Sequence, residues 1–182
     1  MIAVLPLLKA AIAPQFHYTG DKGNNITLYE SQPQAKCKWV KLKKTHTQTF
    51  TLKLDKEVDI HPLLAPIKEL KIKCDYIIFC QQENDFYTLL IEMKSNNSTG
   101  WLKQTQAGEI ISHYLIKMIE NHSEFSILAH LKFRHILFSS QVTKKKNTAN
   151  KSFQYDKHQM KNILFIRKPC NTNYPDLAIF LR

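Results

Sequence analysis

Asp75, Glu92 and Lys94 are the residues of this sequence whose types and spacing suit them to act together in chemistry. They lie within or directly after two apolar, β-rich runs, residues 75–80 and 86–93, which are separated by a polar stretch. Two such runs around a short polar connection predict a β-hairpin. Whether the three side chains meet therefore depends on the register of the two strands.

A turn centred between Glu83 and Asn84 would place Glu92 opposite Asp75, because paired residue numbers in an antiparallel hairpin have a constant sum. Their Cβ atoms would then be about 5 Å apart. Two facing carboxylates repel unless a cation lies between them, and carboxylate oxygens are ligands that Mg²⁺ takes. Lys94 lies two residues beyond Glu92 and points from the same face. A metal held by two acids beside an ammonium group is equipped to hydrolyse a phosphodiester bond.

The chain of 182 residues is long enough for one domain with a substantial core, and we predict a single domain over residues 1–182. Its 26 Lys and Arg residues against 15 Asp and Glu give a formal charge of +11, which favours a polyanionic partner, nucleic acid before an acidic membrane surface. A basic protein without such a partner is the alternative. No apolar run approaches the roughly 20 residues of a membrane span.

The four cysteines show no spacing typical of a zinc site, and the four glycines form no phosphate-binding loop. Cys74 and Cys80 have the same strand parity, so both are expected to face away from Asp75 as small core residues. Reduced thiols of this kind predict a cytoplasmic location. Pro6 and Lys9 interrupt the apolar N-terminal segment, and we therefore expect a short buried helix over residues 7–13 rather than a signal peptide.

The rest of the chain predicts an α/β sandwich built on a mixed sheet. Strands are expected within residues 37–54 and over residues 133–139 and 162–167, with a basic, polar loop at 142–158. A helix is expected over about residues 101–121. Its apolar positions at helical spacing are Ala107, Ile111, Tyr114, Leu115 and Met118.

This pattern resembles the PD-(D/E)xK nuclease superfamily. The matching features are Asp75 at the start of one strand, the triplet Glu92, Met93 and Lys94 at the end of the next, and the helix that follows. The family's proline before the Asp is replaced by Cys74. The resemblance covers roughly residues 40–140 and implies the restriction-endonuclease-like fold, an αβββαβ core with a mixed central sheet flanked by helices.

The resemblance also implies roles for individual residues. Asp75, Glu92 and the carbonyl of Met93 would hold Mg²⁺, or Mn²⁺ in its place. The family often adds an acid from an N-terminal element, for which Glu30 is the first candidate and Asp21 the second. A glutamine on the following helix, here Gln104, would hydrogen-bond the attacking water or a phosphate. Lys94 would orient that water and stabilise the charge that builds on the phosphate.

Two groups of basic residues are candidates for contact with nucleic acid. The first, Lys41, Lys43 and Lys44, lies beside Trp39, and the second comprises Lys144, Lys145, Lys146 and Lys151 and is interleaved with Phe153 and Tyr155. The alternatives are the solvated face of an edge strand for the first group and a solvated loop for the second.

Together these observations predict a Mg²⁺-dependent endonuclease that acts on DNA in preference to RNA. The resemblance to the nuclease superfamily further implies, by analogy of fold, a defence or mobile-element setting. The absence of an obvious specificity domain suggests a partner, either a second copy or a larger nuclease complex, and no membrane is expected. Two alternatives remain: a catalytically inactive nucleic-acid-binding or assembly module on the same fold, and an RNase.

Overall fold

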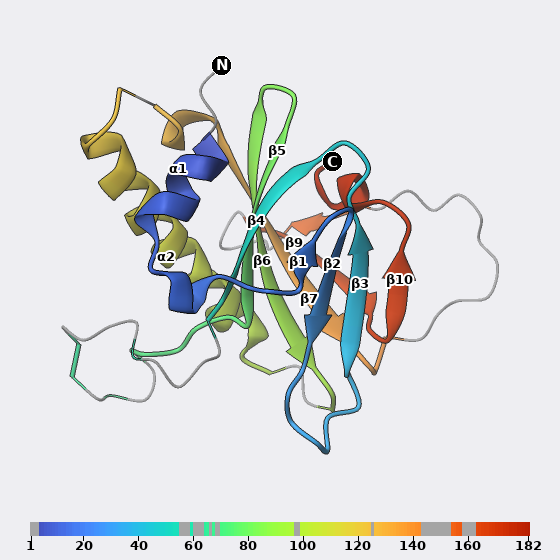
Figure 1. Cartoon of the computed structure of the whole chain (residues 1–182). Coiled ribbons are helices and arrows are strands. Elements are labelled where there is room, and N and C mark those ends of the chain that lie inside the picture. Colours follow the sequence, from blue (N-terminus) through green and yellow to red (C-terminus); the bar gives the residue numbers. More distant parts are fainter. Residues whose placement is uncertain are drawn as a thin grey trace.

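The computed structural model describes residues 4–54, 59, 64–65, 67, 70–96, 99–124, 126–142, 154–157 and 163–182. The described elements form three layers (Figure 1). One layer holds the helices α1 (Val4–Ala11) and α2 (Trp101–Asn121). The predicted α/β class with a mixed sheet is confirmed, and α2 has the bounds that the sequence indicated. The N-terminal helix begins and ends earlier than expected.

The central layer is a six-stranded sheet with the order β4-β5-β6-β7-β9-β8. Its strands are β4 (Gln48–Lys53), β5 (Tyr76–Gln82), β6 (Asp85–Lys94), β7 (Leu131–Ser139), β8 (Asp156–Lys157) and β9 (Leu164–Pro169). The strand pairs β6–β7 and β7–β9 are parallel, and the other pairs are antiparallel.

The third layer is a four-stranded sheet with the order β1-β2-β3-β10. It comprises β1 (Asp21–Lys22), β2 (Asn25–Tyr29), β3 (Trp39–Lys43) and β10 (Thr172–Tyr174). Three 3₁₀ helices, Pro14–Phe16, Leu128–His130 and Leu177–Phe180, complete the described elements. Because β10 pairs with β3 and β9 pairs with β7, the sheets extend well beyond the predicted core at residues 40–140.

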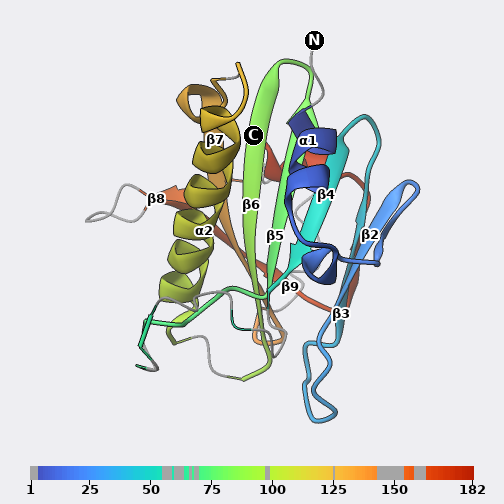
Figure 2. The same ribbon diagram turned by 60° about the vertical axis from the view of Figure 1, so that its left-hand side comes forward.

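The central sheet was predicted to be flanked by helices, and in the described part of the chain the helices lie against one of its two faces. Helices α1 and α2 cover one face, and the outer sheet covers the other (Figure 2). The reason lies in the alternation of β2 and β3, whose inward residues Ile26, Leu28, Val40 and Leu42 are completely buried. These side chains pack on the central sheet and form one core with it.

The register of the β5–β6 hairpin is the one predicted from the sequence. Its pairs run from Gln82 with Asp85 to Tyr76 with Ile91, so the paired numbers have the same sum throughout. The turn consists of Glu83 and Asn84, and Glu83 adopts the left-handed conformation with φ 54°. Continued by one residue, this register sets Asp75 opposite Glu92.

Helix α2 connects the parallel strands β6 and β7, so the carboxyl ends of both strands lie at one edge of the central sheet. The face through which the helix packs only partly matches the predicted one, since Ile111 is buried and Leu115 packs against the core as expected. Tyr114 and Met118 are 63% and 44% exposed. The buried residues of α2 are Trp101, Thr105, Gly108, Ile111, Ser112, Ile116 and Ile119. Small and polar residues at three of these positions let the helix approach the sheet closely.

The two cysteines expected to share one face lie on opposite faces of the central sheet. Cys80 belongs to the core between the two sheets, whereas Cys74 belongs to the core beneath the helices. Regular strand geometry begins only at Tyr76, so the alternation that holds along β5 does not extend back to Cys74.

Within the part of the chain that the structure describes, no helix is long and apolar enough to cross a membrane.

Candidate active site

The two predicted acidic ligands meet at the open end of the hairpin. The ladder between β5 and β6 ends at Tyr76 and Ile91. Beyond it, the N–H of Met93 donates to Oδ2 of Asp75 at 2.7 Å, and the N–H of Asp75 donates to Oε2 of Glu92 at 3.3 Å. The two carboxylates are therefore held side by side by main-chain groups of the two segments that carry them.

Lys94 joins this pair, as its position two residues after Glu92 predicted. Its Nζ lies 2.6 Å from Oε1 of Glu92, and the Glu92 side chain is 1% exposed whereas that of Lys94 is 25% exposed. A buried carboxylate is stable as an anion only beside a cation or strong donors. Lys94 supplies one positive charge to a site with two acids, so a net negative charge remains to attract a further cation.

The negative charge of the site also affects the thiol of Cys74, which lies beneath it. Burial raises the pKa of Cys74 well above its usual value, and the charges of Glu92 and Asp75 raise it further. Cys74 is therefore a neutral packing residue beside the site and contributes no thiolate to it.

The donors at this end of the hairpin suit Mg²⁺. Asp75 and Glu92 offer carboxylate oxygens, which hard cations prefer. The N–H of Met93 points toward Asp75, and the carbonyl of a strand residue points to the same side as its N–H. Among the described residues no group of three or more His, Cys, Asp and Glu side chains gathers around one point. An ion here would take its remaining ligands from the carbonyl and from water, as Mg²⁺ commonly does.

Gln104 lies on the helix face that overlies this end of the hairpin. One turn further along α2 is Gly108, where a Cβ atom would come within 2.5 Å of Sγ of Cys74 and 3.2 Å of Cδ2 of Leu90. Residues four apart share a helix face, so the half-buried Gln104 lies on the side of α2 that faces Cys74 and its neighbour Asp75. Helix α2 begins after Gly100, which has φ 76°, and no side chain caps its N-terminus.

The two candidates for an additional acid are not brought to this site. Glu30 follows β2 in the outer sheet, and its Oε1 accepts the N–H of Gln32 at 3.0 Å. Asp21 lies in a cavity beside α1 and β4, where it accepts hydrogen bonds from Thr49 and Thr51. Thr51 pairs with Ile78 and Thr49 with Cys80, which places Asp21 along the sheet toward the turn of the hairpin.

The basic candidates have different environments. Lys41 and Lys43 are exposed on β3, whereas the ammonium of Lys44 lies 2.5 Å from Oδ1 of Asp21 and forms a largely buried ion pair. The interpretation of the first group as an edge-strand face was wrong, because β3 lies between β2 and β10. The second group lies outside the described residues: Lys144, Lys145, Lys146 and Lys151.

The aromatic partner expected beside the second basic group serves a packing role. The hydroxyl of Tyr155 donates to the carbonyl of Phe180 at 2.9 Å, and the guanidinium of Arg134 lies 5.3 Å from the centre of the Tyr155 ring. Burial raises the pKa of Tyr155, which is consistent with a ring packed against the protein. Phe153 lies outside the described residues.

Arg167 is a cation on the same face of the central sheet as Glu92, and the sequence did not single it out. It lies on β9 in register with Leu137 of β7, which is in register with Glu92 of β6. In-register residues of parallel strands share a face, so the exposed Arg167 lies on the same face of the sheet as Glu92. The two residues are separated by two strand spacings, which is about 10 Å. Its guanidinium lies 5.9 Å from the centre of the buried ring of Trp101. Only the pairing of three strands distant in sequence reveals this cation.

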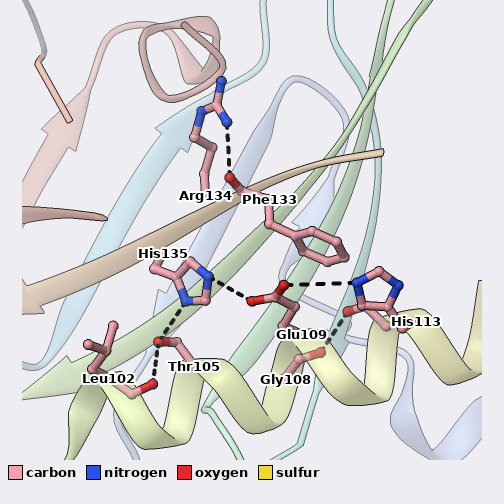
Figure 3. Close-up of polar contacts among 9 residues, drawn as sticks. Leu102, Thr105, Gly108, Glu109, His113, Phe133, Arg134 and His135 are labelled. Atoms are coloured by element: carbon pink, nitrogen blue, oxygen red, sulfur yellow. Dashed lines mark hydrogen bonds and ion pairs between the residues drawn. The ribbon is translucent and has the colours of Figure 1, made fainter. Parts of the chain in front are cut away.

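A second polar cluster, which the sequence also did not reveal, fixes α2 on the sheet (Figure 3). His135 of β7 is 1% exposed; its Nδ1 lies 2.9 Å from Oγ1 of Thr105 and its Nε2 lies 3.1 Å from Oε2 of Glu109. The Thr105 hydroxyl in turn donates to the carbonyl of Leu102. Because Thr105 directly follows Gln104, these contacts hold the turn of α2 that carries Gln104 against the sheet.

No protein-family model matches this sequence, and the comparisons with curated proteins and with solved structures also find no significant match.

Proposed function

We propose that this protein is a Mg²⁺-dependent nuclease of the PD-(D/E)xK type, with Asp75, Glu92 and Lys94 as its catalytic residues. The observation that carries the proposal is the joining of the two carboxylates by the N–H groups of Met93 and Asp75, with the ammonium of Lys94 on Glu92. Opposed acids at the end of a buried hairpin repel each other and are costly for the fold, and a bound cation would relieve that repulsion.

The order of elements supports the same family. Helix α1 is followed, after the three strands of the outer sheet, by β4, β5 and β6, then by α2 and β7. Leaving out that insertion, this is the αβββαβ order of the restriction-endonuclease-like core. Asp75 directly precedes the second strand of that order, Glu92 lies in the third, and α2 is the next helix after the motif, as the family's pattern implies.

Each residue of the candidate site has a task in the proposed reaction. Asp75, Glu92 and the Met93 carbonyl would hold Mg²⁺, which would supply Lewis-acid polarisation of the phosphate and a more acidic water. Lys94 orients the attacking water and stabilises the negative charge of the transition state. Gln104 positions the water or a phosphate oxygen from the helix side.

Arg167 extends the site along the sheet. At about 10 Å from Glu92 it lies beyond the reach of the reacting phosphate and suits a phosphate further along the same strand. The net charge of +11 supports a nucleic acid as the substrate, and we assign DNA as the preferred one. All four cysteines are free and buried, in keeping with a reducing, cytoplasmic setting.

The test is cleavage of supercoiled DNA, linear DNA, single-stranded DNA and RNA by the purified protein with Mg²⁺, Mn²⁺ or EDTA. The variants are Asp75→Asn, Glu92→Gln and Lys94→Met. Glu83→Gln is a matched control, because it makes the same change at the exposed turn of the same hairpin. We expect metal-dependent cleavage that each site variant lowers at least about 100-fold and that the control leaves unchanged.

Thermal unfolding of each variant separates loss of chemistry from loss of fold. Cleavage of RNA alone would change the substrate to RNA and leave the site assignment in place. Cleavage that survives Glu92→Gln or EDTA would overturn the proposal. Binding of nucleic acid without cleavage by any preparation would favour the inactive binding module.

A further inference from the structure

Strands β2 and β3 present two aromatic rings and two lysines on the exposed face of the outer sheet. Alternate residues of β2 and β3 are completely buried between the sheets, so the residues between them point outward. The outward residues with large side chains are Tyr29 of β2 and Trp39, Lys41 and Lys43 of β3. These four residues are here named the sheet platform.

The platform is ordered along the strands. Tyr29 lies directly opposite Trp39, so the two rings occupy neighbouring positions at one end, and the lysines follow along β3. Tyr29 is 54% exposed, and Trp39 is half-buried. The remaining outward positions of β2 and β10 are neutral and hydrogen-bonding: Asn25, Thr27 and Asn173.

Ordinary structural roles do not account for these residues. Lysines often protect an edge strand from pairing with another chain, but β3 lies inside its sheet. An aromatic ring contributes to stability mainly through burial, and more than half of Tyr29 remains in solvent. Aromatic and cationic side chains exposed together on a sheet indicate a ligand with flat rings and negative charge.

We infer that the sheet platform binds single-stranded nucleic acid. Unpaired bases stack on exposed aromatic rings, and lysines contact the phosphates between them. Paired bases are stacked inside a duplex and cannot lie on a sheet face, so the rings favour a single strand. The net charge of +11 strengthens attraction to the phosphates.

The aromatic end of the platform is tied to the candidate active site by hydrogen bonds. The hydroxyl of Tyr76, next to Asp75, accepts the N–H of Tyr29 at 3.1 Å and donates to the Tyr29 carbonyl at 2.6 Å. Oγ of Ser95, next to Lys94, accepts the N–H groups of Lys36 and Cys37. A strand stacked on the platform and passing round this end approaches the site; this part of the inference rests on the proposed nuclease function.

Binding is measured by fluorescence anisotropy in EDTA with oligo(dT), oligo(dU), oligo(U) and a DNA duplex of about 12 nucleotides or base pairs. The Asp75→Asn protein serves as the parent, so that cleavage cannot interfere. We expect Tyr29→Ala and Trp39→Ala each to weaken single-strand binding by about tenfold and to change duplex binding little. Tyr114→Ala, which removes an exposed ring from α2, is the matched control.

The lysines are tested by salt dependence. For Lys41→Ala/Lys43→Ala we expect the slope of log affinity against log salt concentration to fall by about 1.4, which is about 0.7 for each lost contact with a single strand. Lys117→Ala, at an exposed position on α2, should leave the slope unchanged. Both platform lysines are exposed, so this variant tests the surface even if Trp39→Ala disturbs the fold.

Tryptophan fluorescence reports the stacking directly. The chain has two tryptophans, and Trp101 is 4% exposed, so Trp101→Phe leaves the emission of Trp39 alone. We expect a saturating single strand to quench that emission. Unchanged emission at saturation, or equal binding by the parent and both aromatic variants, would overturn the inference.

The outcomes also separate this inference from the nuclease proposal. If the protein binds single strands through the platform but never cleaves them, the platform inference is supported and the proposed nuclease function is wrong. If the protein cleaves with Mg²⁺ but the Tyr29→Ala and Trp39→Ala variants bind single strands as well as the parent, the nuclease proposal is supported and the platform inference is wrong. Stronger binding to oligo(U) than to oligo(dU), or the reverse, identifies the sugar that the platform prefers, because these two strands differ only at the 2′ position.

Discussion

At the residue scale, the two side chains of the Lys94–Glu92 ion pair differ greatly in their exposure to solvent. Glu92 is almost fully enclosed, whereas a quarter of the Lys94 side chain is in solvent. Loss of the lysine leaves a buried charge without its cation, but loss of the acid leaves a lysine that can turn toward water. The two substitutions should therefore have unequal effects on stability.

We predict that Lys94→Met lowers the free energy of unfolding of the metal-free protein by about 2 kcal/mol, less than for a fully buried pair because Lys94 is partly exposed. Glu92→Gln should cost about 1 kcal/mol or less. The double variant should be more stable than Lys94→Met alone, because the uncompensated charge is gone. Urea unfolding in EDTA measures all four proteins. Additive effects of the two substitutions would show that the pair is not coupled as the 2.6 Å contact implies.

At the scale of elements, the seating of α2 depends on the absence of a side chain at Gly108. A Cβ atom there would overlap Sγ of Cys74, on the segment that carries Asp75. Alanine is about 1 kcal/mol more favourable than glycine in a helix, but overpacking a core costs about 1–3 kcal/mol. The close approach therefore outweighs the gain in helix propensity, and it also sets the distance of Gln104 from the hairpin.

We predict that Gly108→Ala destabilises the protein by about 1–2 kcal/mol and lowers the cleavage rate proposed for the site. In a Cys74→Ala background, where the overlapping sulfur is absent, the same substitution should be neutral or stabilising. Urea unfolding of the four proteins of this cycle is the measurement. An equal cost of Gly108→Ala in both backgrounds would locate the strain elsewhere.

The β5–β6 hairpin and helix α2 show how much of the site could be predicted from the sequence. A two-residue turn and strict alternation determined the hairpin register, and so the meeting of Asp75 with Glu92 could be foreseen. The buried face of α2 could not, because Thr105, Gly108 and Ser112 do not contribute to an apolar periodicity. These residues are buried because α2 packs closely on the sheet and because His135 contacts Thr105. Both interactions join residues that are far apart in the sequence.

At the scale of the whole molecule, the outer sheet could not be foreseen for a similar reason. Strand β10 pairs with β3 from the far end of the chain, and the side chain of Asn171 accepts the N–H of Lys38. No local sequence pattern predicts the pairing of strands that are so far apart in the chain. The sequence did reveal the charge balance, and this property complicates any measurement of metal binding.

A net charge of +11 makes the folded protein repel itself, so any added salt stabilises it by screening. Specific Mg²⁺ binding must therefore be measured at constant ionic strength, with NaCl replaced by MgCl₂. A ligand that binds only the folded state stabilises it by RT ln(1 + [L]/Kd), which for a Kd of about 1 mM gives ~1.4 kcal/mol at about 10 mM Mg²⁺. We predict a stabilisation of this order for the unaltered protein.

Glu92→Gln should abolish that stabilisation, because it removes a carboxylate ligand at a buried position. Glu83→Gln, with the same loss of charge at the exposed turn, should retain it in full. The difference between the two variants separates a site from a surface effect, since both have the same net charge. Thermal unfolding at matched ionic strength is the measurement, and an equal response of both variants to Mg²⁺ would show that the ion acts only through general screening.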